Sequence, residues 1–149
     1  MLSTFAKLNL KDQRQIVVIE APQSFEPELA TLAGVTVRRS LEDLDAVAFF
    51  LAFVKTQKDV DTLARAVGKM APGDAVVWFA YPKGSSKKYK CEINRDTGWT
   101  ALGKAGFEPV RMVAIDEDWS AVRFRRVEFI KSLTRPKAHR LSSAGRAKR

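Results

Sequence analysis

Uninterrupted apolar runs mark the expected strands of this chain. Residues 16–19 read Ile-Val-Val-Ile and predict a strand over residues 15–20, and the runs at 46–54 and 75–81 predict two central strands. Polar residues do not alternate within these runs, so both faces of each strand are expected to be buried. Helices should therefore cover both sides of the sheet. A weaker strand is expected over residues 35–39.

An amphipathic helix is predicted between the two central strands. Val60, Leu63, Ala64 and Val67 recur at the spacing that places side chains on one face of a helix. Thr56 precedes this pattern and is expected to cap the first turn. The strand, helix and strand then form a βαβ unit, which is almost always right-handed and makes its two strands parallel.

Two shorter helices are expected elsewhere in the chain. One covers residues 25–32 and has Ser24 as its expected N-cap. The other covers residues 99–105, with Asn94 or Asp96 available as its cap.

Residues 107–115 and 119–127 form the last pair of predicted strands. The turn between them is too short for a parallel crossover, so the two strands must form an antiparallel hairpin. In the second strand Val122 and Phe124 alternate with arginines, which indicates one wetter face. The predicted fold is a three-layer α/β domain with a mostly parallel sheet of about six strands, in which the strand 119–127 is antiparallel.

This order of elements resembles a pared-down class I methyltransferase domain, in which the last strand inserts antiparallel beside a parallel sheet. Met-Ala-Pro-Gly-Asp at 70–74 is similar to the turn before the fifth strand of that fold, and Ala-Gly-Phe at 105–107 is similar to the turn before the sixth. Tyr-Pro-Lys-Gly-Ser-Ser at 81–86, Ile-Asn-Arg-Asp at 93–96 and Asp-Glu-Asp-Trp-Ser at 116–120 resemble a family of small bacterial proteins without an assigned activity. The resemblance covers residues 8–128 and implies a Rossmann-like fold with the strand order 2-1-3-4-6-5.

The methyltransferase resemblance also implies a place for S-adenosylmethionine, at a glycine-rich turn after the first strand. Residues 20–25 occupy that place and contain no glycine, while Pro22 removes a backbone donor. Glu20 corresponds to the acidic residue at the end of that strand in the resemblance. S-adenosylmethionine is therefore not expected at the usual place, and methyl transfer is not expected. A methyltransferase with an altered loop over residues 20–24 stays open as an alternative.

Composition narrows the possible chemistry. The chain has 149 residues, 46% of them hydrophobic, which fits one globular domain over residues 1–130. His139 and Cys91 are the only histidine and cysteine, too few for a zinc site or a Ser-His-Asp triad within the chain. The longest apolar run is too short to span a membrane, and residues 1–10 do not resemble a signal peptide. A cytoplasmic location and no membrane partner are therefore expected.

Positive charge is concentrated at the C-terminal end. The formal net charge is +9, and residues 131–149 contain seven basic residues and no acidic ones, which leaves 19 basic against 17 acidic residues before them. This segment is poor in large apolar residues, so a disordered tail is expected beyond Pro136. Its expected role is sequence-independent contact with nucleic acid or another polyanion, and the alternative is a tail that only improves solubility. The contacting residues would be Arg135, Lys137, Arg140, Arg146, Lys148 and Arg149.

A ligand site is expected where the carboxyl ends of the parallel strands converge. The loop over residues 81–90 combines lysines with Gly84 and two serines, groups that together can hold a phosphate or a carboxylate. The alternative is a loop that lysines merely keep solvated. Arg95 could add a guanidinium fork, although capping by Asp96 and pairing of Arg95 with an acid explain the same residues structurally.

The turn of the predicted hairpin lies at the same edge. Asp116, Glu117 and Asp118 suggest a hard metal ion, but consecutive acids in a tight turn point in different directions, so no metal is predicted. Trp119 follows them and could stack on a planar ligand or simply pack in the core. Trp78 and Trp99 lie at apolar positions and are expected to be packing residues.

These observations favour a protein that binds an anionic or nucleotide-like ligand, with little or no catalytic activity. The expected ligand contacts are Glu20, Tyr81, Lys83, Ser85, Ser86, Arg95, Asp116 and Trp119. Besides the methyltransferase, one further alternative stays open: an accessory protein that binds nucleic acid non-specifically through the tail.

Overall fold

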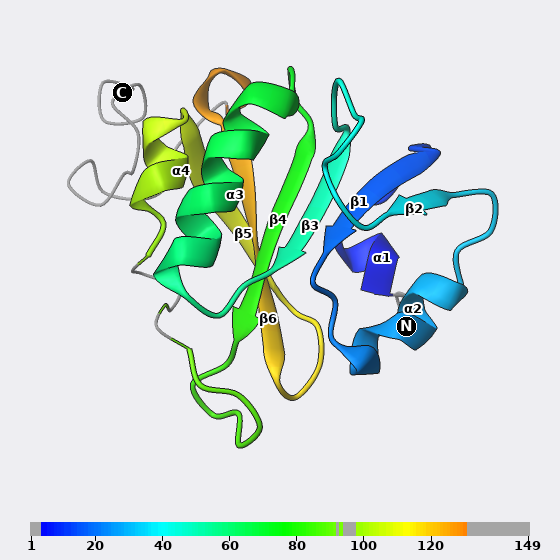
Figure 1. Ribbon diagram of the computed structural model, residues 1–149, viewed down its shortest axis with the longest axis vertical. Helices are drawn as coiled ribbons and strands as arrows, with labels where there is room; N and C mark the ends of the chain where they lie inside the picture. Colours follow the sequence, from blue (N-terminus) through cyan, green and yellow to red (C-terminus); the bar gives the residue numbers. More distant parts are fainter. Residues whose placement is uncertain (1–3, 92, 94–97, 131–149) are drawn as a thin grey trace.

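A single six-stranded sheet organises the part of the chain that the computed structural model describes, which is residues 4–91, 93 and 98–130 (Figure 1). The strands are β1 (Gln15–Ile19), β2 (Thr36–Arg38), β3 (Phe49–Phe53), β4 (Val76–Pro82), β5 (Phe107–Ala114) and β6 (Trp119–Arg126). They lie in the order β2-β1-β3-β4-β6-β5. Strands β2, β1, β3 and β4 are parallel, and β6 runs antiparallel to β4 and to β5. The predicted fold class and strand order are confirmed.

Helices cover both faces of this sheet, as the apolar runs predicted. The helices are α1 (Thr4–Lys7), α2 (Glu26–Ala30), α3 (Gln57–Met70) and α4 (Thr100–Lys104), with 3₁₀ turns η1 (Gln23–Phe25) and η2 (Val127–Phe129). Buried residues of α3 and α4 pack in one core cluster with Phe50, Phe79 and Phe124 of the sheet. Buried residues of α1, η1 and α2 pack in a second cluster with Ile16, Val18 and Trp78. We call these two sides the α3 face and the α1 face.

The amphipathic helix between the central strands is confirmed as α3. Val60, Ala64 and Val67 are fully buried, and Thr56 is the N-cap. The Thr56 hydroxyl accepts a hydrogen bond from the Asp59 backbone N–H (3.1 Å), and the Asp59 carboxylate accepts one from the Thr56 N–H (3.3 Å). This reciprocal capping box fixes the point at which the chain leaves β3 and turns into the helix.

The short helix after β1 begins differently from the prediction. Ser24 was expected as its N-cap but lies inside η1, and α2 starts after Phe25 without a side-chain cap. Phe25 is 1% exposed, and its ring lies 5.7 Å from that of Phe5 and 5.0 Å from that of Phe53. Burial of this large ring decides where the helix starts, because it outweighs a single capping hydrogen bond.

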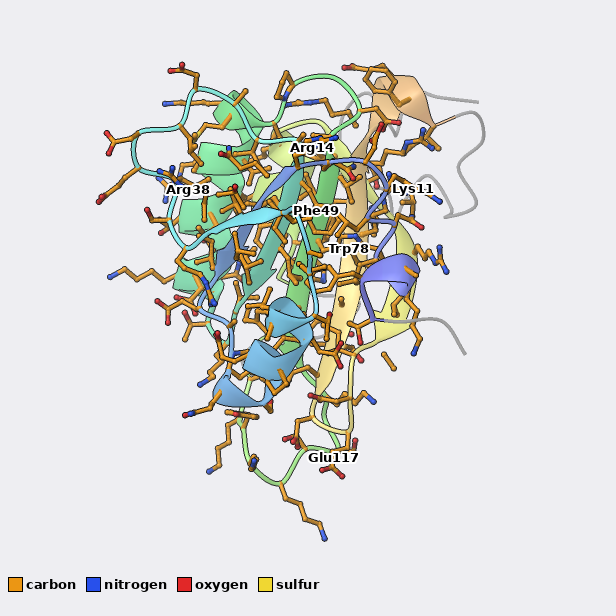
Figure 2. All side chains as sticks on the ribbon, turned by 90° about the vertical axis from the view of Figure 1, so that its right-hand side faces the viewer. Lys11, Arg14, Arg38, Phe49, Trp78 and Glu117 are labelled. Carbon is orange, nitrogen blue, oxygen red and sulfur yellow. The ribbon has the colours of Figure 1, made fainter. Side chains whose placement is uncertain are left out.

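The two tryptophans expected to pack in the core do so. Trp78 lies in the middle of β4 with no exposed surface, and its indole N–H donates to the Leu8 carbonyl (2.7 Å), which ties the segment after α1 to the sheet (Figure 2). Trp99 is 1% exposed and packs edge-on against Phe79. Asn94 and Asp96, the expected caps of the helix that follows, lie outside the described residues.

Arg126 joins the last strand to the ends of two helices. Its guanidinium donates to the carbonyls of Gly68 and Ala71 at the end of α3, and to the carbonyl of Ala105 at the end of α4. The same group lies 4.6 Å from the centre of the Phe107 ring. These bonds satisfy carbonyls that a helix end leaves without a partner, and the positive charge suits the negative end of the helix dipole.

None of the helices in the described part of the chain is both long and apolar enough to cross a lipid bilayer.

Candidate functional site

The loops at the carboxyl ends of the parallel strands meet beside the turn of the β5–β6 hairpin (Figure 1). At the last pair of the β4–β6 ladder, Pro82 lies opposite Trp119. One residue further on, the Lys83 N–H donates to the Asp118 carbonyl (2.8 Å). The loop over residues 81–90 and the turn over residues 116–119 therefore lie side by side at this edge, as the sequence predicted.

A pocket of about 490 Å³ lies under the loop that follows β4. It collects three of the predicted contacts, Tyr81, Lys83 and Ser86, and adds residues that the sequence analysis did not single out. Its full lining is Tyr81, Pro82, Lys83, Gly84, Ser86, Tyr89, Lys90, Cys91 and Ile93. The lining contains two lysines and no acidic residue, so the described walls of the pocket favour a negatively charged occupant.

Ser86 holds the loop in its folded shape. Its hydroxyl donates to the Asp118 carboxylate (2.8 Å) and accepts from the backbone N–H groups of Lys88 and Tyr89, both at 3.2 Å. From the sequence, this hydroxyl was expected to contact a ligand. The structure instead uses it to tie the loop to the hairpin turn, because Asp118 is the neighbour across the sheet edge. Ser86 therefore shapes the pocket that it lines.

Trp119 is a core residue and not an open stacking surface. It is 1% exposed, and its ring lies 5.1 Å from that of Phe53 and 5.0 Å from that of Tyr89. Lys55 covers the outer side of this group, with its ammonium 4.7 Å from the centre of the Tyr89 ring. Of the two interpretations that the sequence left open for Trp119, packing is the one that its burial supports.

The acids of the hairpin turn are used within the turn. The Asp116 carboxylate accepts from the backbone N–H groups of Asp118 (2.8 Å) and Trp119 (2.9 Å). Asp118 accepts from Ser86, and Glu117 is exposed at the tip (Figure 2). Asp116 thus stabilises the turn that presents Asp118 to the loop, and this is the role that the structure gives it.

The remaining predicted contacts among the described residues do not line the pocket. Glu20 is an exposed residue at the end of β1, with a φ of 56°. Ser85 is exposed on the outer side of the loop. Arg95 and the six basic tail residues lie outside the described residues. Tyr89 was not singled out from the sequence; it is an aromatic residue with lysines at 87, 88 and 90 around it, and that contrast was the signal that could have identified it.

The turn after β1 does not fit S-adenosylmethionine in the manner of a glycine-rich loop. Glu20 stands in a left-handed conformation with a side chain in place, and Pro22 offers no N–H. The chain then enters η1, where the Phe25 N–H already donates to the Pro22 carbonyl (2.9 Å). A glycine-rich loop offers free backbone N–H donors and lets the backbone come close to the cofactor. The turn after β1 offers fewer such donors and less room for that approach.

The sequence matches no protein-family model and no curated protein. Among solved structures, it is similar to Aeropyrum pernix fibrillarin in complex with S-adenosyl-L-methionine, with 13% identity, a TM-score of 0.48, and coverage of 74% of this chain and 55% of that one. It is also similar to Methanococcus jannaschii fibrillarin, a pre-rRNA processing protein, with 12% identity, a TM-score of 0.47, and coverage of 85% of this chain and 69% of that one. A Sulfolobus solfataricus protein described as a type 11 methyltransferase is similar with 8% identity, a TM-score of 0.47, and coverage of 85% of this chain and 89% of that one.

The described chain has a Rossmann-like, methyltransferase-like fold. This statement rests on the strand order and on the antiparallel insertion of β6 between β4 and β5. The chain spans about half of the length of the Aeropyrum pernix fibrillarin chain. At these identities the structural likeness concerns the fold, and activity has to be argued from the site.

Proposed function

We propose that the protein binds a small anionic ligand, of the nucleotide or acidic-metabolite class, in the pocket under the loop after β4. The observation that carries this proposal is the pairing of Lys83 and Lys90 in a pocket whose described lining contains no carboxylate. Two ammonium groups in one concave site raise the local concentration of anions.

The aromatic residues of the lining support a ligand that also has a planar part. Tyr89 contributes a half-buried ring to the wall and is held in place by Trp119 behind it, whereas Tyr81 is 6% exposed and packs against Trp99. Rigid aromatic walls combined with a few charged groups are typical of small-molecule sites. A nucleotide satisfies both features, since its base is planar and its phosphate is anionic.

Binding without catalysis is the form of this proposal that the side chains support best. The described lining provides ammonium, phenol, hydroxyl and thiol groups but neither a carboxylate nor an imidazole, which are the usual general bases near neutral pH. The lysines are suited to hold a charge, and Ser86 is already engaged by Asp118.

A ligand panel followed by thermal unfolding tests the proposal. Nucleotides, inorganic phosphate and acidic metabolites are added in turn, and a ligand at about 100 times its dissociation constant should add roughly 2.7 kcal/mol to the free energy of unfolding. The variant Lys83→Gln/Lys90→Gln should lose the shift. The matched control is Lys87→Gln/Lys88→Gln, which removes two exposed lysines of the same loop that do not line the pocket. If no ligand raises the melting temperature, or if both variants lose the effect equally, the pocket is not the binding site.

Methyl transfer is the second candidate, because the fold is methyltransferase-like. It would require S-adenosylmethionine to bind beside the altered turn over residues 20–24. Calorimetric titration with S-adenosylmethionine distinguishes the two candidates. Micromolar binding that survives Lys83→Gln/Lys90→Gln would favour the methyltransferase and contradict our preferred proposal.

A further inference from the structure

Three arginines lie together on the α1 face of the β5–β6 hairpin. Arg111 lies directly opposite Arg123, and Arg125 follows two residues further along β6. Opposite residues of an antiparallel pair project from the same face, so all three side chains leave the sheet on the side of Ala121 and Trp119. We call this group the arginine stripe.

A bulge in β5 brings Arg111 into the stripe. The register shifts between Pro109 and Arg111, so that Phe107 lies opposite Arg126 on the α3 face whereas Arg111 lies opposite Arg123 on the α1 face. Without the extra residue, Arg111 would project from the same face as Phe107. Bulges of this kind commonly redirect a side chain at a functional position.

Among the described residues, acidic partners lie at one end of the stripe. Asp74 forms two hydrogen bonds with Arg125 (2.7 and 2.6 Å), and Glu108 lies opposite Arg125 in the hairpin. Arg111, at the other end, has a long contact to the neutral Asn9 side-chain oxygen (3.4 Å). The pair Arg111 and Arg123 therefore places two like charges opposite each other, an arrangement that destabilises a hairpin.

Arg123 is the least satisfied member of the stripe. Its Nε is buried without a hydrogen-bond partner among the described residues. Burial lowers the pKa of Arg123, the charges of Arg125 and Arg111 lower it further, and Asp74 only partly opposes them. An anion placed between the exposed ends of Arg111 and Arg123 would relieve the repulsion between the two guanidiniums.

We propose that the arginine stripe binds the phosphate backbone of nucleic acid. Each guanidinium presents a planar fork that matches a phosphate. Arg111 and Arg123 face each other across the hairpin and project from the same side, so their guanidiniums can hold one phosphate together, while Arg125 is already paired with Asp74. The pair Arg111 and Arg123 thus fits a phosphate of a nucleic-acid backbone that runs along this face of the hairpin.

An acidic protein partner fits the stripe less well. Protein interfaces usually contain a buried apolar centre. The exposed large hydrophobic residues in the described chain are Val110, Met112 and Phe129, and Met112 lies opposite Val122 on the other face of the hairpin. The stripe also lies along the middle and the far end of β6, away from the pocket at residues 81–90 where β6 begins.

Anisotropy measurements with a short labelled single strand and with a duplex, each at several salt concentrations, test this proposal. The full chain carries Arg111→Gln/Arg123→Gln. On the single strand at about 0.15 M salt the affinity should fall roughly tenfold, and the log–log salt slope should become less steep by about 1.4, the value for two lost phosphate contacts. The matched control is Lys58→Gln/Arg65→Gln, which removes two exposed charges from α3 on the opposite face.

Several results would overturn the proposal. One is that the unmodified protein does not bind the oligonucleotide even at low salt. Another is that the control variant Lys58→Gln/Arg65→Gln loses as much affinity as the stripe variant. A third is unchanged affinity in the stripe variant together with a loss in a full-chain tail variant such as Arg140→Gln/Arg146→Gln. Equally tight binding of poly-glutamate by the unmodified protein would reject the assignment to phosphate. Lys83→Gln/Lys90→Gln should keep its affinity for the oligonucleotide, and a loss there would move the site to the pocket.

Discussion

At the scale of single residues, Arg126 contributes to stability through its geometry as much as through its charge. One guanidinium reaches the carbonyls of Gly68, Ala71 and Ala105, which belong to the ends of two helices. A lysine has the same charge but lacks the planar fork that serves several acceptors together. The residue therefore holds α3 and α4 in place against the end of β6.

Replacing Arg126 with methionine should lower the free energy of unfolding by about 2–3 kcal/mol, because the three carbonyls lose a charged donor. Arg126→Lys should recover part of this loss, since it keeps the positive charge at the helix ends. Urea unfolding monitored by tryptophan fluorescence measures both variants. Arg65→Met, on the exposed side of α3, is the control, and an equal loss in that variant would contradict the role of Arg126.

Arg123 should have the opposite effect on stability. Arg123→Met removes a buried N–H without a partner and a like charge opposite Arg111, while it keeps a long apolar side chain. We expect the free energy of unfolding to rise by about 1 kcal/mol. A loss of stability in urea unfolding would show that the guanidinium has a compensating partner, and the argument for an anion at this position would then fail.

At the scale of elements, the loop after β4 keeps its shape through one hydroxyl. Ser86 connects Asp118 of the hairpin turn with the backbone of Lys88 and Tyr89. Tyr89 in turn packs on Trp119, so the loop is held by a polar contact at one end and an aromatic contact at the other.

Ser86→Ala should loosen this loop, because Asp118 and two backbone N–H groups lose their partner. Amide hydrogen exchange over residues 83–90 should become at least about tenfold faster, which corresponds to roughly 1.4 kcal/mol of local stability. Any ligand of the pocket should bind correspondingly more weakly. The neighbouring Ser85→Ala removes an exposed hydroxyl and serves as the matched control. Equal exchange rates in the two variants would show that Ser86 does not hold the loop.

At the scale of the whole molecule, charge is distributed between the described domain and the tail. The sequence analysis assigned any nucleic-acid affinity to residues 131–149, which contain seven of the 26 basic residues and none of the 17 acidic ones. That assignment stays a prediction, and the arginine stripe adds a second proposed surface with its own variants.

Replacing the six tail residues Arg135, Lys137, Arg140, Arg146, Lys148 and Arg149 with glutamine in the full chain should reduce the salt dependence of duplex binding. If all six contact phosphates, the log–log slope should become less steep by about 5, at roughly 0.9 per contact. Anisotropy at several salt concentrations measures this change. An unaltered slope would leave the tail as a solubility segment, and all measurable affinity would then belong to the folded domain.

The sequence by itself determined the architecture. The apolar runs that became β1, β3 and β4 are signals carried by consecutive residues, and the spacing of Val60, Ala64 and Val67 is equally local. The short turn over residues 116–118 forced the hairpin, because no crossover fits in three residues. The predicted strand order followed from these local signals and from the resemblance to a known fold, and the structure confirms it.

Only the tertiary structure decided how the polar residues are used. Ser86 meets Asp118 across the sheet edge, 32 positions apart in the chain, and Arg126 meets Gly68 at a separation of 58. Trp119 begins a strand at a polar turn, yet Phe53 and Tyr89 bury it. A single bulge after Pro109 turned Arg111 from one face of the sheet to the other. The periodicity of apolar residues predicts which side chains are buried. The hydrogen-bond partner of a polar side chain, and the face of the sheet from which it projects, depend on strand register and on contacts between distant segments, which no local pattern encodes.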